Sequence, residues 1–129
     1  MTGALADKRR VLVVEDDGMV RRLLAAILER GGYTVAQAAN GIEALGCIDS
    51  DPVDIIVLDL LMPVMDGLKF LHQLRQVRKL DIPVLVLTAA LNHANGDEQR
   101  ILDAGAERVA RKPVKAPELL ELLQQLLNA

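Results

Sequence analysis

The stretch IIVLDLLMPVMDG, residues 55–67, places a carboxylate between two apolar runs. Residues 55–58 are all apolar, Asp59 follows them, and residues 60–62 are apolar again. An ionised carboxylate is costly to bury unless it is paired with a cation or bound to a metal. Asp59 is therefore expected at the open end of a buried strand, in the company of other charged groups.

Short apolar runs and helical patterns alternate along the rest of the chain. Strands are predicted at residues 11–14, 33–39, 54–59, 82–88 and 107–111, and helices at 19–30, 40–48, 66–78, 97–105 and 117–127. Continuous apolar strands joined by helices are typical of a parallel sheet that is covered on both faces. The pattern predicts an α/β fold, in which ligands bind beyond the carboxyl ends of the strands.

The predicted helices carry caps and apolar stripes. Asn40 is expected to cap the second helix, and Asp17 and Asp66 are interpreted as helix caps rather than ligands.

The apolar stripes are Val20, Leu23, Leu24, Ile27 and Leu28 on the first helix and Leu68, Leu71, Leu74 and Val77 on the third. The last helix carries leucines at positions 119, 120, 122, 123, 126 and 127. Either the core absorbs all of these leucines, or some of them form a dimer or partner surface.

The bulk composition indicates one domain of ordinary globular character. The chain has 129 residues, 51% of them apolar and 26% charged, with a net charge of −3. That charge offers nucleic acid no attraction, so direct nucleic-acid binding is not expected. There is one cysteine, no secretory signal and no apolar run long enough for membrane insertion. We expect a cytoplasmic protein with a flexible N-terminal tail at residues 1–9 and one domain at residues 10–129.

Polar residues stand at the ends of four predicted strands. Glu15 and Asp16 end the first strand, Asp59 the third and Thr88 the fourth, and Lys112 follows the fifth. These residues should converge, because the carboxyl ends of parallel strands share one edge of the sheet. Clustered carboxylates repel one another, and a hard cation such as Mg²⁺, which also binds phosphate oxygens, relieves that repulsion. The cluster predicts a Mg²⁺ site beside a phosphoryl group, with Asp59 as the nucleophile that forms an aspartyl phosphate.

The same motifs resemble those of a known family. VLVVEDD (11–17), VLDLLMPVMDG (57–67), LTA (87–89) and KP (112–113) follow the order in which response-regulator receiver domains carry them. The likeness runs from about Val11 to Leu127, and the ordered set is far more specific than any single motif. The chain thus resembles a single-domain, chemotaxis-regulator-like receiver domain of two-component signalling.

The resemblance implies a fold and a reaction. The implied fold is a flavodoxin-like, doubly wound sheet of five parallel strands in the order 2-1-3-4-5, with five helices. The implied reaction is Mg²⁺-dependent transfer of a phosphoryl group from a kinase phosphohistidine to Asp59. The peptide bond between Lys112 and Pro113 would be cis, which costs an X–Pro bond only about 0.5–1 kcal/mol.

The resemblance also assigns the remaining site groups. Glu15, Asp16 and Asp59 would hold Mg²⁺ together with the backbone carbonyl of Leu61. Thr88 and Lys112 would bind the phosphoryl oxygens, assisted by the backbone N–H groups of Leu60 and Ala89.

The implied function is that of a phosphorylation-dependent signalling switch. A sensor histidine kinase or a histidine phosphotransfer protein would be the donor, and a downstream protein target or a homodimer would receive the signal. The domain would catalyse only its own phosphorylation and dephosphorylation. The alternative is a receiver-like interaction or dimerisation module that is not phosphorylated. A small Mg²⁺ phosphatase is disfavoured, because such enzymes place a second acid two residues after the nucleophile, where this chain has Leu61.

Three departures from the family pattern bear on signalling. Val109 stands where the family commonly has an aromatic residue that reports phosphorylation at the surface, so signalling here should rely on backbone shifts or have a different output. The loop at residues 89–99 looks longer than usual. Leu61 and Ala90 cannot orient an attacking water by hydrogen bonding, which predicts slow self-dephosphorylation.

Overall fold

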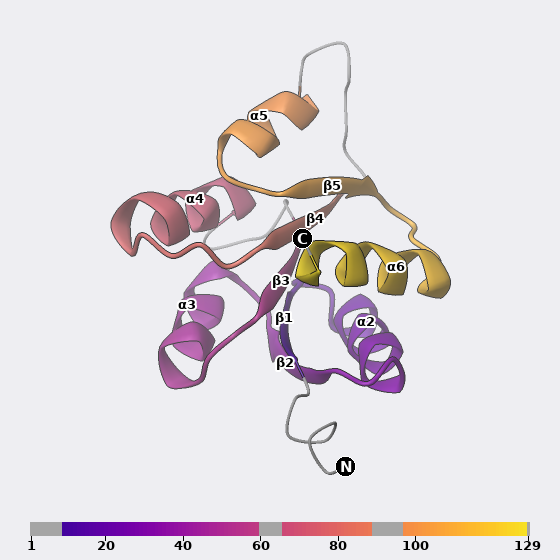
Figure 1. Cartoon of the computed structure of the whole chain (residues 1–129). Helices are drawn as coiled ribbons and strands as arrows, with labels where there is room; N and C mark the ends of the chain where they lie inside the picture. Colours follow the sequence, from indigo (N-terminus) through magenta and orange to yellow (C-terminus); the bar gives the residue numbers. More distant parts are fainter. Residues whose placement is uncertain (1–8, 60–65, 89–96, 129) are drawn as a thin grey trace.

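A sheet of five parallel strands forms the centre of the molecule (Figure 1). The computed structural model describes residues 9–59, 66–88 and 97–128, so the predicted tail at residues 1–9 lies, apart from Arg9, outside the described residues. The strands are β1 (Arg10–Val14), β2 (Thr34–Ala38), β3 (Ile55–Asp59), β4 (Val84–Thr88) and β5 (Arg108–Arg111). Their order, β2-β1-β3-β4-β5, confirms the predicted flavodoxin-like topology.

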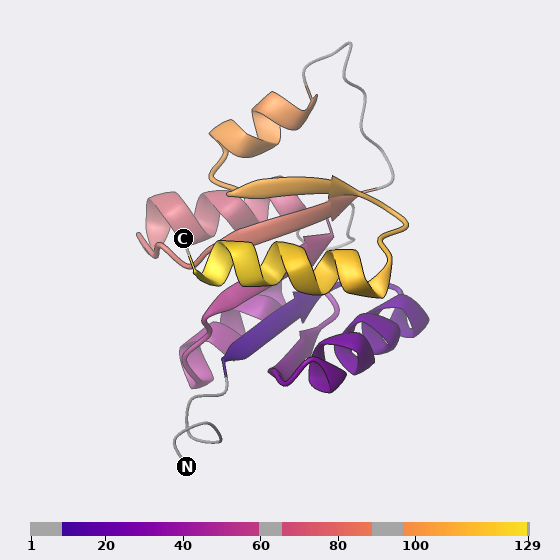
Figure 2. The ribbon, with the colours of Figure 1, turned by 45° about the vertical axis from the view of Figure 1, so that its right-hand side comes forward.

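Helices cover both faces of this sheet. In the described part of the chain they are α2 (Gly18–Arg30), α3 (Gly41–Ser50), α4 (Gly67–His72), α5 (Asp97–Asp103) and α6 (Ala116–Leu127). At its end α4 continues into a π-helical stretch, η1 (Gln73–Val77). Figures 1 and 2 show α2 and α6 on one face of the sheet and α3 and α4 on the other.

The inner strands supply most of the core. Residues 11–14, 55–59 and 84–88 are all buried, as their continuous apolar sequences predict. Alternate side chains pack against the two helical layers. One layer is formed with Leu24, Leu28, Leu119 and Leu123, and the other with Ala44, Leu45, Phe70, Leu71, Leu74 and Ile101. Strand ends anchored in this way provide a rigid platform for side chains at the edge of the sheet.

The predicted apolar stripe of the third helix is partly wrong. Leu68 and Val77 are 40% and 58% exposed, and the buried residues of α4 and η1 are Gly67, Phe70, Leu71 and Leu74. At about 3.6 residues per turn, Leu68 and Val77 are about 2.5 turns apart and face opposite directions. The buried set instead follows the i, i+3, i+4, i+7 pattern of one helical face.

On α2 the predicted stripe is too wide. Leu24, Ala25 and Leu28 are buried, whereas Leu23 is 60% exposed. A helix that contacts a sheet along one line buries a narrow stripe, and Leu23 lies beside that line.

The leucines of α6 are absorbed by the core. Leu119 and Leu123 are fully buried, and the other four pack, partly buried, against the same hydrophobic cluster as α2. This outcome supports the first of the two readings of the sequence. A homodimer therefore stays a prediction, and these leucines give it no support.

The predicted helix caps are confirmed. Asp17 accepts hydrogen bonds from the backbone N–H groups of Met19 and Val20, Asn40 caps α3, and Asp66 caps α4.

Within the described ranges, no helix combines the length and the apolar character that a membrane span requires.

Candidate functional site

The predicted site residues gather at one edge of the sheet. Asp59 and Thr88 are the last residues of β3 and β4, and Glu15 directly follows β1. In the parallel register Asp59 is aligned with Leu87, one residue before Thr88, so both strands end at nearly the same level. Lys112 follows β5 and donates its backbone N–H to the carbonyl of Thr88 at 3.0 Å. The convergence expected for parallel strands is therefore present.

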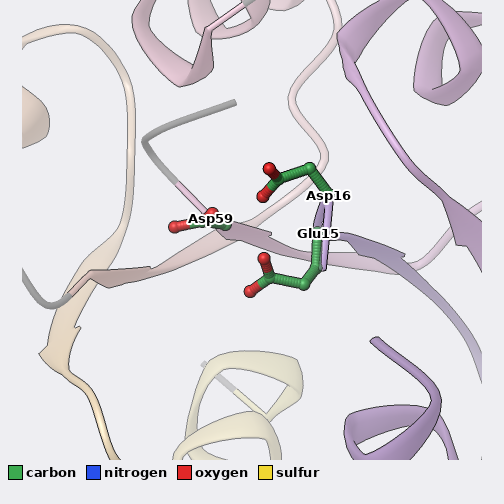
Figure 3. A group of neighbouring side chains, drawn as sticks. All are labelled: Glu15, Asp16 and Asp59. Atoms are coloured by element: carbon green, nitrogen blue, oxygen red, sulfur yellow. The ribbon is translucent and has the colours of Figure 1, made fainter. Parts of the chain in front are cut away.

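Three carboxylates form the acidic part of the site. Glu15, Asp16 and Asp59 each place one oxygen within 4.8 Å of the others, around the ends of β1 and β3 (Figure 3). Glu15 and Asp59 are 2% and 9% exposed, whereas Asp16 is exposed. Carboxylate oxygens are hard ligands, so this donor set fits a divalent cation such as Mg²⁺ and not a metal that prefers sulfur or imidazole.

Lys112 is the cation that faces these acids. Its Nζ lies 2.5 Å from Oε1 of Glu15 and 3.5 Å from Oδ1 of Asp59. The peptide bond that joins it to Pro113 is cis, as the resemblance to receiver domains implies. The side chain of Lys112 is 24% exposed, so it is only partly shielded from solvent.

Burial and charge shift the two partners in the same direction. Burial raises the pKa of Glu15 above its ordinary value, and the hydrogen bonds from Lys112 and from the backbone of Asp17 only partly oppose that rise. Burial acts to lower the pKa of Lys112, but the hydrogen bond to Glu15 and the charge of Asp59 outweigh it, so that the pKa is raised. The raised pKa values therefore favour a charged ammonium on Lys112 beside a Glu15 carboxyl that resists ionisation.

The remaining predicted groups divide into two sets. Thr88 is fully buried at the end of β4, between β3, which ends at Asp59, and β5, which ends one residue before Lys112. Leu60, Leu61 and Ala89, whose backbone groups are predicted to take part, lie outside the described residues. Ala90 and most of the 89–99 loop lie outside them as well.

One contact at the site was not foreseen from the sequence. The guanidinium of Arg21, on α2, donates from Nη1 to the backbone carbonyl of Glu15 at 2.8 Å. The available signal was an arginine one turn into the helix that follows the acidic pair. Long helical side chains point back toward the helix N-terminus, which here is the site.

Comparisons with known proteins agree with this geometry. The sequence model of the response regulator receiver domain matches residues 11–124. Among curated proteins, the response regulator MprA of Mycobacterium ulcerans (strain Agy99) is 45% identical over 121 residues, which cover 92% of this chain and 50% of that protein. MprA of Mycobacterium avium (strain 104) is 44% identical over the same length. The chain thus spans about half the length of the curated relatives it matches.

Solved structures show the same fold. The chemotaxis protein CheY4 of Vibrio cholerae superposes with a TM-score of 0.84 at 32% identity, covering 92% of this chain and 98% of that one. The receiver domain of sensor histidine kinase PA1611 from Pseudomonas aeruginosa PAO1 gives 0.83 at 32% identity, covering 95% and 99%. That structure is described with a magnesium ion coordinated in its active site cleft. The chain belongs to the response regulator receiver domain family, and it is a signalling domain of two-component systems.

Proposed function

We propose that this receiver domain is switched by phosphorylation of Asp59, with a histidine kinase or a histidine phosphotransfer protein as the donor. One observation carries the proposal: Asp59 ends the central strand within 4.8 Å of two further carboxylates and 3.5 Å from the ammonium of Lys112. This surrounding suits a carboxylate that acts as a nucleophile on a phosphoryl group, because it combines oxygen ligands for a cation with a positive charge for the transferred oxygens.

The proposed transfer moves a phosphoryl group from a donor nitrogen to an oxygen of this chain. An oxygen of Asp59 forms a bond to phosphorus, while the bond between phosphorus and the donor's imidazole nitrogen breaks. The imidazole leaves with that electron pair and takes up a proton, so the donor histidine returns to its neutral form. The product is a mixed anhydride, an aspartyl phosphate, on this chain.

The chain's own residues would bind and orient the reacting groups. Glu15, Asp16 and Asp59 would hold Mg²⁺ with the carbonyl of Leu61, and the bound ion would neutralise charge on the phosphoryl oxygens. Lys112 is positioned to exchange its contact with Asp59 for a contact with a phosphoryl oxygen at the same place. The magnesium described for the PA1611 receiver domain supports this choice of metal.

Thr88 would complete the oxygen-binding set. It ends β4 and lies beside β5 in the sheet, and the backbone N–H groups of Leu60 and Ala89 would add two donors.

The signal would leave the domain through protein contacts. We place the receiver domain at residues 10–129 and assign its output to a downstream protein target or to a second copy of the chain. Val109, in β5, is half-buried and packs against the cluster formed with α3, α4 and α5. Since a valine has no ring to swing, phosphorylation would be reported by backbone movement around β4 and β5.

Intact-mass spectrometry tests the proposal. The wild-type protein incubated with acetyl phosphate and Mg²⁺ should gain the mass of one phosphoryl group, and EDTA should prevent the gain. Asp59→Asn should show no gain while keeping the circular-dichroism spectrum of the wild type. The proposal would be overturned if the folded wild-type protein gained no mass from acetyl phosphate and also gained none from a phosphohistidine-bearing phosphotransfer protein.

A further inference from the structure

We infer that Arg21 is a positioning residue for the metal site, acting on the peptide bond that joins Glu15 to Asp16. The inference rests on the proposed function, because it concerns how the acids that would bind Mg²⁺ are held. The observation behind it is the hydrogen bond of 2.8 Å from the guanidinium of Arg21 to the carbonyl oxygen of Glu15.

That carbonyl determines how both acids are presented. It belongs to the peptide group between Glu15 and Asp16, so fixing its direction fixes the plane that connects the two α-carbons. The N–H of Glu15 is held by the carbonyl of Ala38 at 3.0 Å, and its carboxylate accepts the N–H of Asp17 at 3.2 Å. Arg21 adds a hydrogen bond to the backbone carbonyl of Glu15 in this short segment.

The helix gives Arg21 a fixed base. Asp17 caps α2 by accepting hydrogen bonds from Met19 and Val20 at 2.9 and 3.1 Å. The N–H of Arg21 is bonded to the carbonyl of Asp17 at 2.8 Å, so the residue is part of the first hydrogen-bonded turn. Its half-buried side chain reaches back over that turn to the carbonyl, which ties β1, the acids and α2 into one unit.

Geometry and charge predict opposite effects of Arg21 on metal binding. As a permanent positive charge bonded to the backbone carbonyl of Glu15, one of the clustered acids, Arg21 should repel a second cation, so removing its charge should tighten Mg²⁺ binding. As the group that holds the acids in place, Arg21 should strengthen binding, so removing its hydrogen bond should weaken it. The sign of the change in affinity therefore distinguishes the two roles.

Calorimetric titration with Mg²⁺ at fixed ionic strength measures this sign. For Arg21→Met we expect a dissociation constant about tenfold above that of the wild type, the loss typical of removing an outer-shell partner of a metal site. Arg21→Lys keeps the charge and one donor group, so its dissociation constant should lie between those of the wild type and of Arg21→Met. Arg22→Met is the matched control. It removes the same charge from the next residue of α2, which is exposed, and it leaves the hydrogen bond from Arg21 to Glu15 in place.

Phosphorylation at saturating Mg²⁺ separates positioning from general damage. If Arg21 acts by holding the metal ligands, excess Mg²⁺ should restore the rate of phosphorylation of Arg21→Met by acetyl phosphate. Circular dichroism shows whether that variant is folded, and Arg21→Lys carries the test if it is not.

The outcomes separate this inference from the proposed function. A wild-type protein that binds no Mg²⁺ overturns both. Normal binding by the wild type with unchanged or tighter binding by Arg21→Met overturns only the role of Arg21. Equal weakening by Arg22→Met also overturns it, because the loss would then not depend on the hydrogen bond from Arg21 to the carbonyl of Glu15.

Discussion

At the scale of single residues, Lys112 is the cation on which the buried acids depend. Its ammonium lies 2.5 Å from a Glu15 oxygen and 3.5 Å from an Asp59 oxygen. The pKa of Glu15 is raised above 4.5 by burial, so folding disfavours its ionised form. The stability that this shift contributes is present below about pH 4.5 and is lost as the pH rises through the folded pKa. Lys112 limits that loss by hydrogen-bonding the ionised carboxylate.

We expect Lys112→Met to destabilise the protein in a pH-dependent manner. Well below pH 4.5 Glu15 is protonated in both the folded and the unfolded state, and the substitution should cost little. At neutral pH the variant buries an unpaired carboxylate, and the free energy of unfolding should fall by about 1–3 kcal/mol. Urea unfolding at acidic and neutral pH measures the difference. Lys115→Met, at an exposed lysine, is the control, and an equal loss at both pH values for Lys112→Met would contradict the argument.

Leu61 allows a second prediction at this scale. The resemblance to the family and the absence of a hydrogen-bonding side chain at this position predict slow loss of the phosphoryl group from Asp59. Leu61→Asn should shorten the phosphoryl half-life, measured by intact mass after the donor is removed. Leu68→Asn places the same amide on an exposed position of α4 and should leave the half-life unchanged. A half-life that Leu61→Asn does not alter would refute the explanation.

At the scale of elements, Arg75 joins three segments at the edge of the sheet opposite the site. From η1 its guanidinium donates to the carbonyls of Leu80 at 2.7 Å, Ile82 at 2.8 Å and Gly105 at 2.9 Å. It also bonds Glu107 at 3.0 Å, and its side chain is only 13% exposed. Gly105 has a φ of +120°, and a Cβ there would lie 2.6 Å from Cγ of Arg75. The turn after α5 is therefore shaped around this arginine.

Arg75→Met should lower the free energy of unfolding by about 3 kcal/mol, because it removes the guanidinium donor from the carbonyls of Leu80, Ile82 and Gly105. Urea unfolding monitored by circular dichroism measures the loss. Arg78→Met is the control, since Arg78 forms one ion pair with the exposed Asp49, and such pairs contribute about 0–1 kcal/mol. Similar losses in the two variants would show that the buried network adds nothing beyond a surface ion pair.

At the scale of the whole molecule, a cation bound to the three clustered carboxylates should stabilise the fold. The three clustered carboxylates repel one another, so a ligand that binds only the folded state should stabilise the entire domain. We expect Mg²⁺ to raise the midpoint of thermal unfolding, and at a concentration about 100 times the dissociation constant the gain should be about 2.7 kcal/mol.

Asp59→Asn should reduce this stabilisation, because it removes one charged ligand. Asp51→Asn, at an exposed acid outside the cluster, should retain it. Thermal unfolding with MgCl₂ or with NaCl of equal ionic strength measures the effect. A midpoint that rises equally in both salts would show that general screening, and not a metal site, is responsible.

Much of this protein follows from the sequence alone. The continuous apolar runs before Glu15 and Asp59 predict buried parallel strands, and strands of that kind must end at the same edge. The meeting of Glu15 with Lys112, 97 residues apart, could therefore be predicted from strand order. The caps Asp17, Asn40 and Asp66 were also predictable, because capping depends on a local side chain and the N–H groups beside it.

Only the tertiary structure decided the contacts that hold these parts in place. Arg21 bonds the carbonyl of Glu15, and Arg75 bonds the carbonyls of Leu80, Ile82 and Gly105. For Arg21 the sequence indicates that the side chain points back toward the site, but every residue carries the same backbone carbonyl, so it does not indicate which carbonyl an arginine will reach. Periodicity describes the faces within one element, whereas these hydrogen bonds depend on how the ends of several elements are packed together.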